Sequence, residues 1–261
     1  MQICLYLLLG KRVIMYYWIS SGLQLLCCVI GLILFKDIWF NSKKALFPKL
    51  VALGVACITL GSLNDVAYFI VRKTQFNGLY IGFFWIIGCF LSLLSVSYGQ
   101  LDRLFDDSSK AFFKYRIISI SAPIVVSALF VPVFMTSNLP MSMRIFAFLG
   151  WLPAIFASYY NLKHSILPDC GFVFVKAVRP YNITAVILEV SYTIHIVLRI
   201  YQLNIGILIS SIVVSSSLIA LLYFAKKGVA QWTIWYMFSL FVYVRRCFWW
   251  WSLQITKRED C

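Results

Sequence analysis

Seven long apolar runs divide the chain, and this division limits its possible folds more than any other feature of the sequence. Each run has about the 20 residues that an α-helix needs to cross a bilayer. Backbone polar groups in lipid must be satisfied within the protein, so the runs are predicted to be helices rather than open strands. The predicted spans are Met15–Phe35, Leu50–Ile70, Leu79–Tyr98, Ile117–Met135, Ile145–Leu162, Tyr181–Tyr201 and Leu203–Ala225.

Composition supports the same fold class. Of the 261 residues, 62% are hydrophobic and 12% are charged, and a soluble domain carries about twice that charged fraction. We predict an all-α polytopic membrane bundle of seven transmembrane helices over residues 14–225. The N-terminal segment, residues 1–13, is expected at the interface. The aromatic and basic tail, residues 226–261, is expected to form either an interfacial helix or an eighth span.

The formal charge of +14 would point to nucleic acid in a soluble protein. Here the basic residues lie between apolar runs, so topology and lipid headgroups explain them, and nucleic acid is not an expected partner. The first, third and fifth loops, with Lys226 and Lys227, hold 13 Lys and Arg, against 6 on the other side. This imbalance places the N-terminus outside a cell membrane and the third loop in the cytoplasm.

Catalytic and metal-binding patterns are scarce. There are eight cysteines without a CxxC pair, and only two histidines, so neither a metal site nor a cofactor is expected. The sequence also lacks Gly-x-Ser-x-Gly, His-Glu-x-x-His and a phosphate-binding glycine loop. We therefore expect no enzymatic activity in this chain.

Asp65 is one of two acids placed inside apolar sequence. An ionised carboxylate in hydrocarbon costs at least about 2.5–3.5 kcal/mol. Tyr68, three residues later, shares its helical face. Two interpretations remain open: a structural carboxylate that is hydrogen-bonded between helices or kept neutral, and a ligand-binding or proton-linked group.

Four residues from different spans are predicted at one depth, about 8–10 Å below the outer surface at 1.5 Å per residue: Asp65, Trp85, Trp151 and His195. This coincidence predicts an outward-facing pocket for a small cationic ligand. Asp65 and Tyr68 would anchor the ligand, the two tryptophans would form walls, and His195 would add a second polar contact. The alternative for the tryptophans is ordinary apolar packing.

Glu189 is the second embedded acid and begins a polar stripe with Tyr192, His195 and Arg199 on the same span. The stripe is either polar contact between helices or an intramembrane relay in which His195 can titrate. The serines of the last span are expected to bond their own helix; they are Ser210, Ser211, Ser215, Ser216 and Ser217.

The stretch 63–97 carries a loose motif: Asp65, then Tyr68, then Gly78-Leu79-Tyr80, then Trp85 and Gly88. A basic loop with Arg179-Pro180-Tyr181 opens a later span. In these features residues 14–225 resemble the multi-pass membrane sensor region found ahead of bacterial diguanylate cyclases and related signalling proteins. The resemblance implies a small-molecule-sensing domain with a cytoplasmic signalling partner.

The chain departs from that group at two points. Phe83 and Phe84 stand where an acid often precedes the tryptophan, and no Gly-Gly-Asp/Glu-Glu-Phe output loop occurs. Two alternatives are a small-solute transporter or channel, and a seven-helix chemoreceptor of the G-protein-coupled type. The chemoreceptor shares the predicted orientation and an Asp102-Arg103 pair at the inner end of span three.

The predicted topology can be tested at Ser108, in the third loop. The Ser108→Cys protein should stay unlabelled by an impermeant thiol reagent in intact cells and become labelled after permeabilisation. The unsubstituted chain controls for its own cysteines. Strong additional labelling from outside would reverse the orientation.

Overall fold

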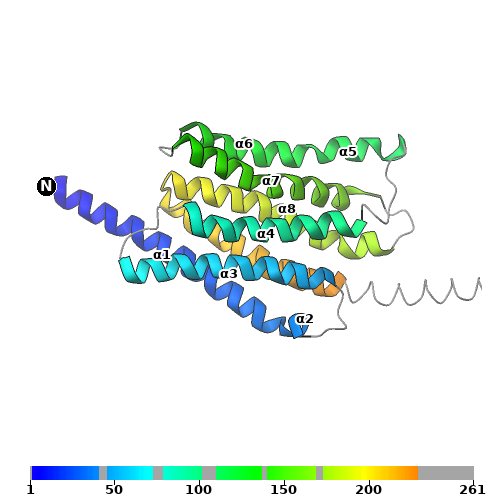
Figure 1. Cartoon of the computed structure of the whole chain (residues 1–261), viewed down its shortest axis with the longest axis horizontal. Helices are drawn as coiled ribbons and strands as arrows, with labels where there is room; N and C mark the ends of the chain where they lie inside the picture. The colour runs from blue at the N-terminus through cyan, green and yellow to red at the C-terminus, as the bar shows by residue number, and fades with distance from the viewer. Residues whose placement is uncertain are drawn as a thin grey trace, which may run out of the picture.

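The computed structural model describes residues 2–40, 46–72, 79–101, 110–136, 140–168 and 173–228, and they are helical almost throughout. Within these ranges there is no strand, which confirms the all-α prediction. Figure 1 shows the long helices side by side as a bundle, with α1 crossing obliquely and its N-terminal end extending beyond the others.

Each predicted span falls on a helix or a helix pair. The elements are α1 (Gln2–Leu34), α2 (Lys36–Phe40), α3 (Leu46–Arg72), α4 (Leu79–Leu101), a 3₁₀ turn (Lys110–Phe112), α5 (Phe113–Ser119), α6 (Ser121–Thr136), α7 (Met141–Ile166) and α8 (Val173–Ile200). A further helix, Asn204–Gly228, follows α8 and is called the final helix below.

In the described part of the chain, six helices are long and apolar enough to cross a membrane, and α4 adds a shorter apolar segment, Phe84–Tyr98. The protein is therefore a multi-pass helical membrane protein. The predictions for the Asp102-Arg103 pair, the third loop, Gly78 and the tail beyond residue 228 lie outside the described residues.

α1 is longer than the first predicted span. Its 33 residues extend about 50 Å at 1.5 Å per residue, against a hydrocarbon thickness of about 30 Å. The helix begins at Gln2, so residues 2–13 of the expected interfacial segment continue the helix that contains the span.

The fourth predicted span is broken in two. α5 ends at Ser119 and α6 begins at Ser121, and the N–H of Ile120 bonds the carbonyl of Ile117 in a tighter turn. α6 also contains Pro132, which cannot donate a helical hydrogen bond. The span thus has a one-residue interruption that apolar periodicity does not reveal.

α8 packs against three helices of the bundle. It contacts α4, α6 and α7, and its Tyr181 and Leu188 are fully buried. The Trp151 ring of α7 stacks on Phe130 of α6 at 5.5 Å and meets Phe90 of α4 edge-on at 5.2 Å. These aromatic contacts form the apolar centre of the bundle beside α8.

A tight reversal joins α8 to the final helix. Gln202 adopts a φ of 57°, its N–H bonds the carbonyl of Arg199, and the N–H of Leu203 bonds the carbonyl of Leu198. This is the hydrogen-bond pattern of a Schellman motif, with glutamine where glycine is usual. The turn makes the two helices antiparallel neighbours.

Two glycines allow α3 and α4 to approach closely. A Cβ at Gly88 would lie 3.1 Å from Cys57 Sγ, and a Cβ at Gly54 would lie 3.4 Å from the carbonyl oxygen of Cys89. Packing between membrane helices depends on such small residues.

Replacing Gly88 should therefore destabilise the bundle. Gly88→Val should lower the unfolding free energy in detergent by about 1–3 kcal/mol, because the added methyl groups overpack against Cys57. Gly22→Val is the matched control, since a Cβ at Gly22 has nothing within 4 Å. Equal melting temperatures for the two variants would contradict this account of the interface.

Candidate functional site

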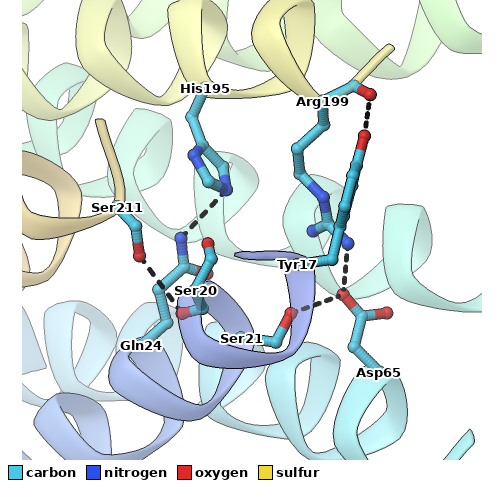
Figure 2. Close-up of polar contacts among 8 residues, drawn as sticks. All are labelled: Tyr17, Ser20, Ser21, Gln24, Asp65, His195, Arg199 and Ser211. Carbon is cyan, nitrogen blue, oxygen red and sulfur yellow. Dashed lines mark hydrogen bonds and ion pairs between the residues drawn. The ribbon is translucent and has the colours of Figure 1, made fainter. Parts of the chain in front are cut away.

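Asp65 of α3 and Arg199 of α8 form an ion pair. Nη2 of Arg199 lies 3.0 Å from Oδ2 of Asp65, and the two side chains are 25% and 17% exposed. Ser21 Oγ of α1 donates to the same Oδ2 at 3.4 Å. Figure 2 shows these groups converging from three helices, so the Asp65 carboxylate faces the interior of the bundle.

The second oxygen of Asp65 is left available. Both contacts fall on Oδ2, and in the described structure no donor bonds Oδ1. In Figure 2 this oxygen points away from Arg199 and Ser21. A partly exposed carboxylate with one uncommitted oxygen can accept a hydrogen bond from another molecule.

One aromatic ring lies against the ion pair, and others stand on α1 and α3. The guanidinium of Arg199 lies 5.2 Å from the centre of the Tyr17 ring, and the Tyr17 hydroxyl bonds the backbone carbonyl of Arg199. Trp18, the next residue of α1, packs on Phe69 of α3, with ring centres 5.9 Å apart. Tyr68 is half-buried on the same helix. Such rings attract cations through their π faces.

His195 lies one turn before Arg199 and joins three helices. Its Nε2 is 3.2 Å from Nε2 of Gln24 in α1, and its Nδ1 is 2.8 Å from Oγ of Ser210 in the final helix. His195 and Gln24 are 1% and 3% exposed. The His195 link is thus sealed from solvent, unlike the ion pair.

The contacts of His195 determine where its proton lies. An amide nitrogen can only donate, so Gln24 donates to Nε2 of the imidazole. Nδ1 then carries the hydrogen and donates to Ser210, whose hydroxyl donates to the carbonyl of Ile207 at 3.0 Å. Neutral imidazole therefore satisfies every donor in this chain of hydrogen bonds.

The serines of the final helix do not all bond their own helix. The Ser215 hydroxyl is buried without a hydrogen-bond partner among the described residues, which contradicts that expectation. Ser210 and Ser217 bond carbonyls of their own helix, as expected. Ser211 instead donates to the backbone carbonyl of Ser20 in α1 at 3.1 Å. With Gln24 and Ser21, this contact makes one face of α1 a polar seam against α3, α8 and the final helix, as Figure 2 shows.

Glu189 belongs to a separate group of side chains, called the Glu189 cluster, with Asn161 of α7 and Ser97 of α4. Asn161 Nδ2 donates to Glu189 Oε1 at 2.7 Å, and the Ser97 hydroxyl contacts Asn161 Oδ1. All three residues are 1% exposed or less. Oε2 of Glu189 is buried without a hydrogen-bond partner.

The polar residues of α8 therefore take part in two separate sets of contacts. Arg199 pairs with Asp65, whereas Glu189, ten residues earlier and about 15 Å along the helix, bonds α7. Tyr192 lies between them, and its ring packs edge-on against Phe90 and His195 at 5.9 and 6.0 Å. The intramembrane relay of Glu189, Tyr192 and Arg199 stays a prediction.

The predicted pocket residues are distributed on both sides of α8. Trp151 is fully buried, and its indole donates to Thr193 at 3.3 Å. Thr193 and His195 are two residues apart, so their side chains leave α8 about 200° apart. Trp85 is half-buried on α4. Asp65, Tyr68 and His195 remain on or near the α1 side of the bundle.

Several site residues were not singled out from the sequence. Gln24, Tyr17 and Ser21 recur at three- and four-residue spacings along α1, which is a weak signal of a polar helix face. Asn161 stands at the end of a predicted span, where a polar residue next to Lys163 and His164 reads as part of the following loop. The pairing of Asp65 with Arg199 had the stronger signal, because opposite charges lay near the same end of two spans.

The opposite end of the bundle has its own ion pair. Nζ of Lys226 lies 3.1 Å from Oδ2 of Asp37, and both side chains are exposed. Asp37 and Ser21 are separated by sixteen residues, about 24 Å of helix. This pair offers a control for substitutions at Asp65.

Comparisons with known proteins identify no relative. No protein-family model, no curated protein and no solved structure matches this chain. The function is therefore inferred from the side chains and their geometry.

The link through His195 should contribute measurably to stability. His195→Leu should lower the unfolding free energy by about 1–3 kcal/mol, because Gln24 is left buried without its acceptor. Gln24→Leu should cost a similar amount, and the double variant should cost clearly less than the sum. Additive effects would show that the two side chains do not interact.

Proposed function

We propose that this protein is a small-molecule-sensing membrane domain that has no catalytic output of its own. The observation that carries the proposal is that only one oxygen of the Asp65 carboxylate has hydrogen-bond partners in the described structure. One of its oxygens holds Arg199 and Ser21, while the other is uncommitted and the side chain is partly exposed. Intramembrane ionisable groups of this kind are functional by default.

The ligand is proposed to be a small organic cation. Oδ1 of Asp65 offers a negatively charged acceptor, and Tyr17, Trp18 and Phe69 supply aromatic surface close by. A carboxylate beside aromatic rings suits an ammonium group better than it suits an anion. His195 would take no direct part, because both of its nitrogens are already bonded.

Binding at Oδ1 would be coupled to the packing of α8. A cation there competes for the carboxylate and repels the guanidinium of Arg199, so it weakens the Asp65–Arg199 pair. Arg199 also holds α1 through Tyr17. A ligand that binds more tightly when the Asp65–Arg199 pair is broken would thereby shift α1 relative to α8. This difference in affinity between the two states is what a signal requires.

The orientation is part of the proposal. The excess of Lys and Arg at the Lys226 end favours a cytoplasmic position for that end in a cell membrane, with the Asp65 end outside. A cytoplasmic signalling partner would then meet the end that carries the Asp37–Lys226 pair. The resemblance to sensor regions of bacterial diguanylate cyclases, carried by Asp65, Tyr68 and Trp85, agrees with this arrangement.

The binding step can be tested by thermal unfolding in lipid nanodiscs. Tetramethylammonium chloride should raise the melting temperature of the unsubstituted protein relative to equal sodium chloride. At about 100 times its dissociation constant, a ligand adds about 2.7 kcal/mol. Asp65→Asn should abolish the shift, whereas Asp37→Asn should retain it, because that acid is paired with Lys226 at the other end.

Exchanging the charges of Asp65 and Arg199 provides a second test of the binding site. The double variant Asp65→Arg with Arg199→Asp keeps a pair between α3 and α8, so it should fold while losing the response to the cation. An unchanged response in this variant would overturn the site. Saturable uptake of tetramethylammonium into proteoliposomes would replace the sensor with a transporter.

A further inference from the structure

The Ser97 hydroxyl has one hydrogen and two acceptors. Its oxygen lies 2.9 Å from the carbonyl of Leu93 and also within hydrogen-bond distance of Asn161 Oδ1. A hydroxyl donates only one hydrogen at a time. The Ser97 hydroxyl can therefore donate either to the carbonyl of its own helix or to Asn161 of α7. The orientation of the Asn161 amide decides which acceptor it uses.

In one arrangement the hydrogen bonds run towards Glu189. Ser97 donates to Asn161 Oδ1, and Asn161 Nδ2 donates to Glu189 Oε1 at 2.7 Å. Every donor then points at the carboxylate, which suits a negative charge. The carbonyl of Leu93 gives up its contact with the hydroxyl in this state.

In the other arrangement the chain runs the opposite way. A half-turn of the Asn161 amide brings Nδ2 to Ser97 and Oδ1 to Glu189. Ser97 then accepts from Asn161 and donates to Leu93, whose carbonyl is 2.9 Å away. Asn161 Oδ1 now needs a donor, and only a protonated Glu189 can supply one.

We propose that the Glu189 cluster is a proton-binding site in which Asn161 reverses its orientation when the proton binds. One proton from the aqueous phase forms an O–H bond at Glu189 Oε1, and no covalent bond of the protein breaks. The charge of the carboxyl changes from −1 to zero. The hydrogen bonds between α4, α7 and α8 are kept in both states, but their direction changes.

This site is separate from Asp65. The ionisable side chains buried on the three helices that build it are Cys89 of α4, Lys163 and His164 of α7, and Tyr181 and Tyr192 of α8. α6, which also packs on α8, contributes no ionisable side chain. Proton binding thus acts on the half of the bundle opposite the proposed ligand site.

The composition makes a direct test possible. Glu189 and Glu259 are the only glutamates in the chain. In protein labelled with ¹³C at glutamate side chains, with Glu259→Gln as background, infrared difference spectra report on Glu189 alone. We expect the carbonyl stretch of a protonated glutamate to appear reversibly as the buffer is made acidic.

The variants then test the switch itself. Glu189→Gln should lose the signal, while Asp65→Asn should keep it. Ser97→Ala should lower the midpoint of the glutamate signal by roughly half to one pH unit, because the protonated state loses one more hydrogen bond, that to Leu93, than the ionised state. Ser95→Ala is the matched control, because Ser95 bonds only its own helix, at Leu91, and it should leave the midpoint unchanged.

Three results would overturn the proposal. The glutamate could stay ionised at every pH, or stay protonated at every pH, and either outcome would make the cluster a static contact. A midpoint that Ser97→Ala leaves unchanged would show that the amide does not reverse. The Glu259→Gln background keeps these outcomes readable even if Glu189→Gln fails to fold.

Discussion

A polar group inside a bilayer has no water to bond. If no protein group forms a hydrogen bond with it, the folded state loses considerable free energy of stabilisation. In the described part of this bundle many hydroxyls bond their own helix, and a second set of polar groups finds partners across helix interfaces. His195 reaches α1 and the final helix, Asn161 reaches α4 and α8, and Ser211 reaches α1. These bonds fix the rotation of each helix about its axis, which apolar packing alone specifies weakly.

α8 makes many of these bonds, and it makes them on two sides. Its α1 side presents His195 and Arg199, and its other side presents Glu189 and Thr193 to α7. The aromatic contacts of Trp151, Phe90 and Phe130 lie on that second side. A disturbance at either polar group therefore reaches the other through one rigid helix, a physical route by which both proposed sites could influence the same packing.

The sequence predicted the helices well because hydrophobic length is a local property that can be counted along the chain. Even so, the interruption at Ile120 and the extension of α1 to Gln2 went unrecognised, since neither alters local hydropathy. The ionisable members of the site were also found. Their partners were not, because Asp65 could have met Arg199 or His195 from the same end of the bundle. Only the relative rotation of the helices, set by neutral residues such as Gln24 and Asn161, decides between them.

The short turn at Gln202 has a consequence for how the protein assembles. Because α8 and the final helix are joined by so few residues, they form a helical hairpin, and the bond between His195 and Ser210 lies inside that hairpin. α1 is synthesised long before, and the partners of its Gln24, Ser21 and Ser20 carbonyl arrive only with α3 and this hairpin. Although α1 precedes these helices in the chain, it is thus among the last of the described helices to have its polar face satisfied.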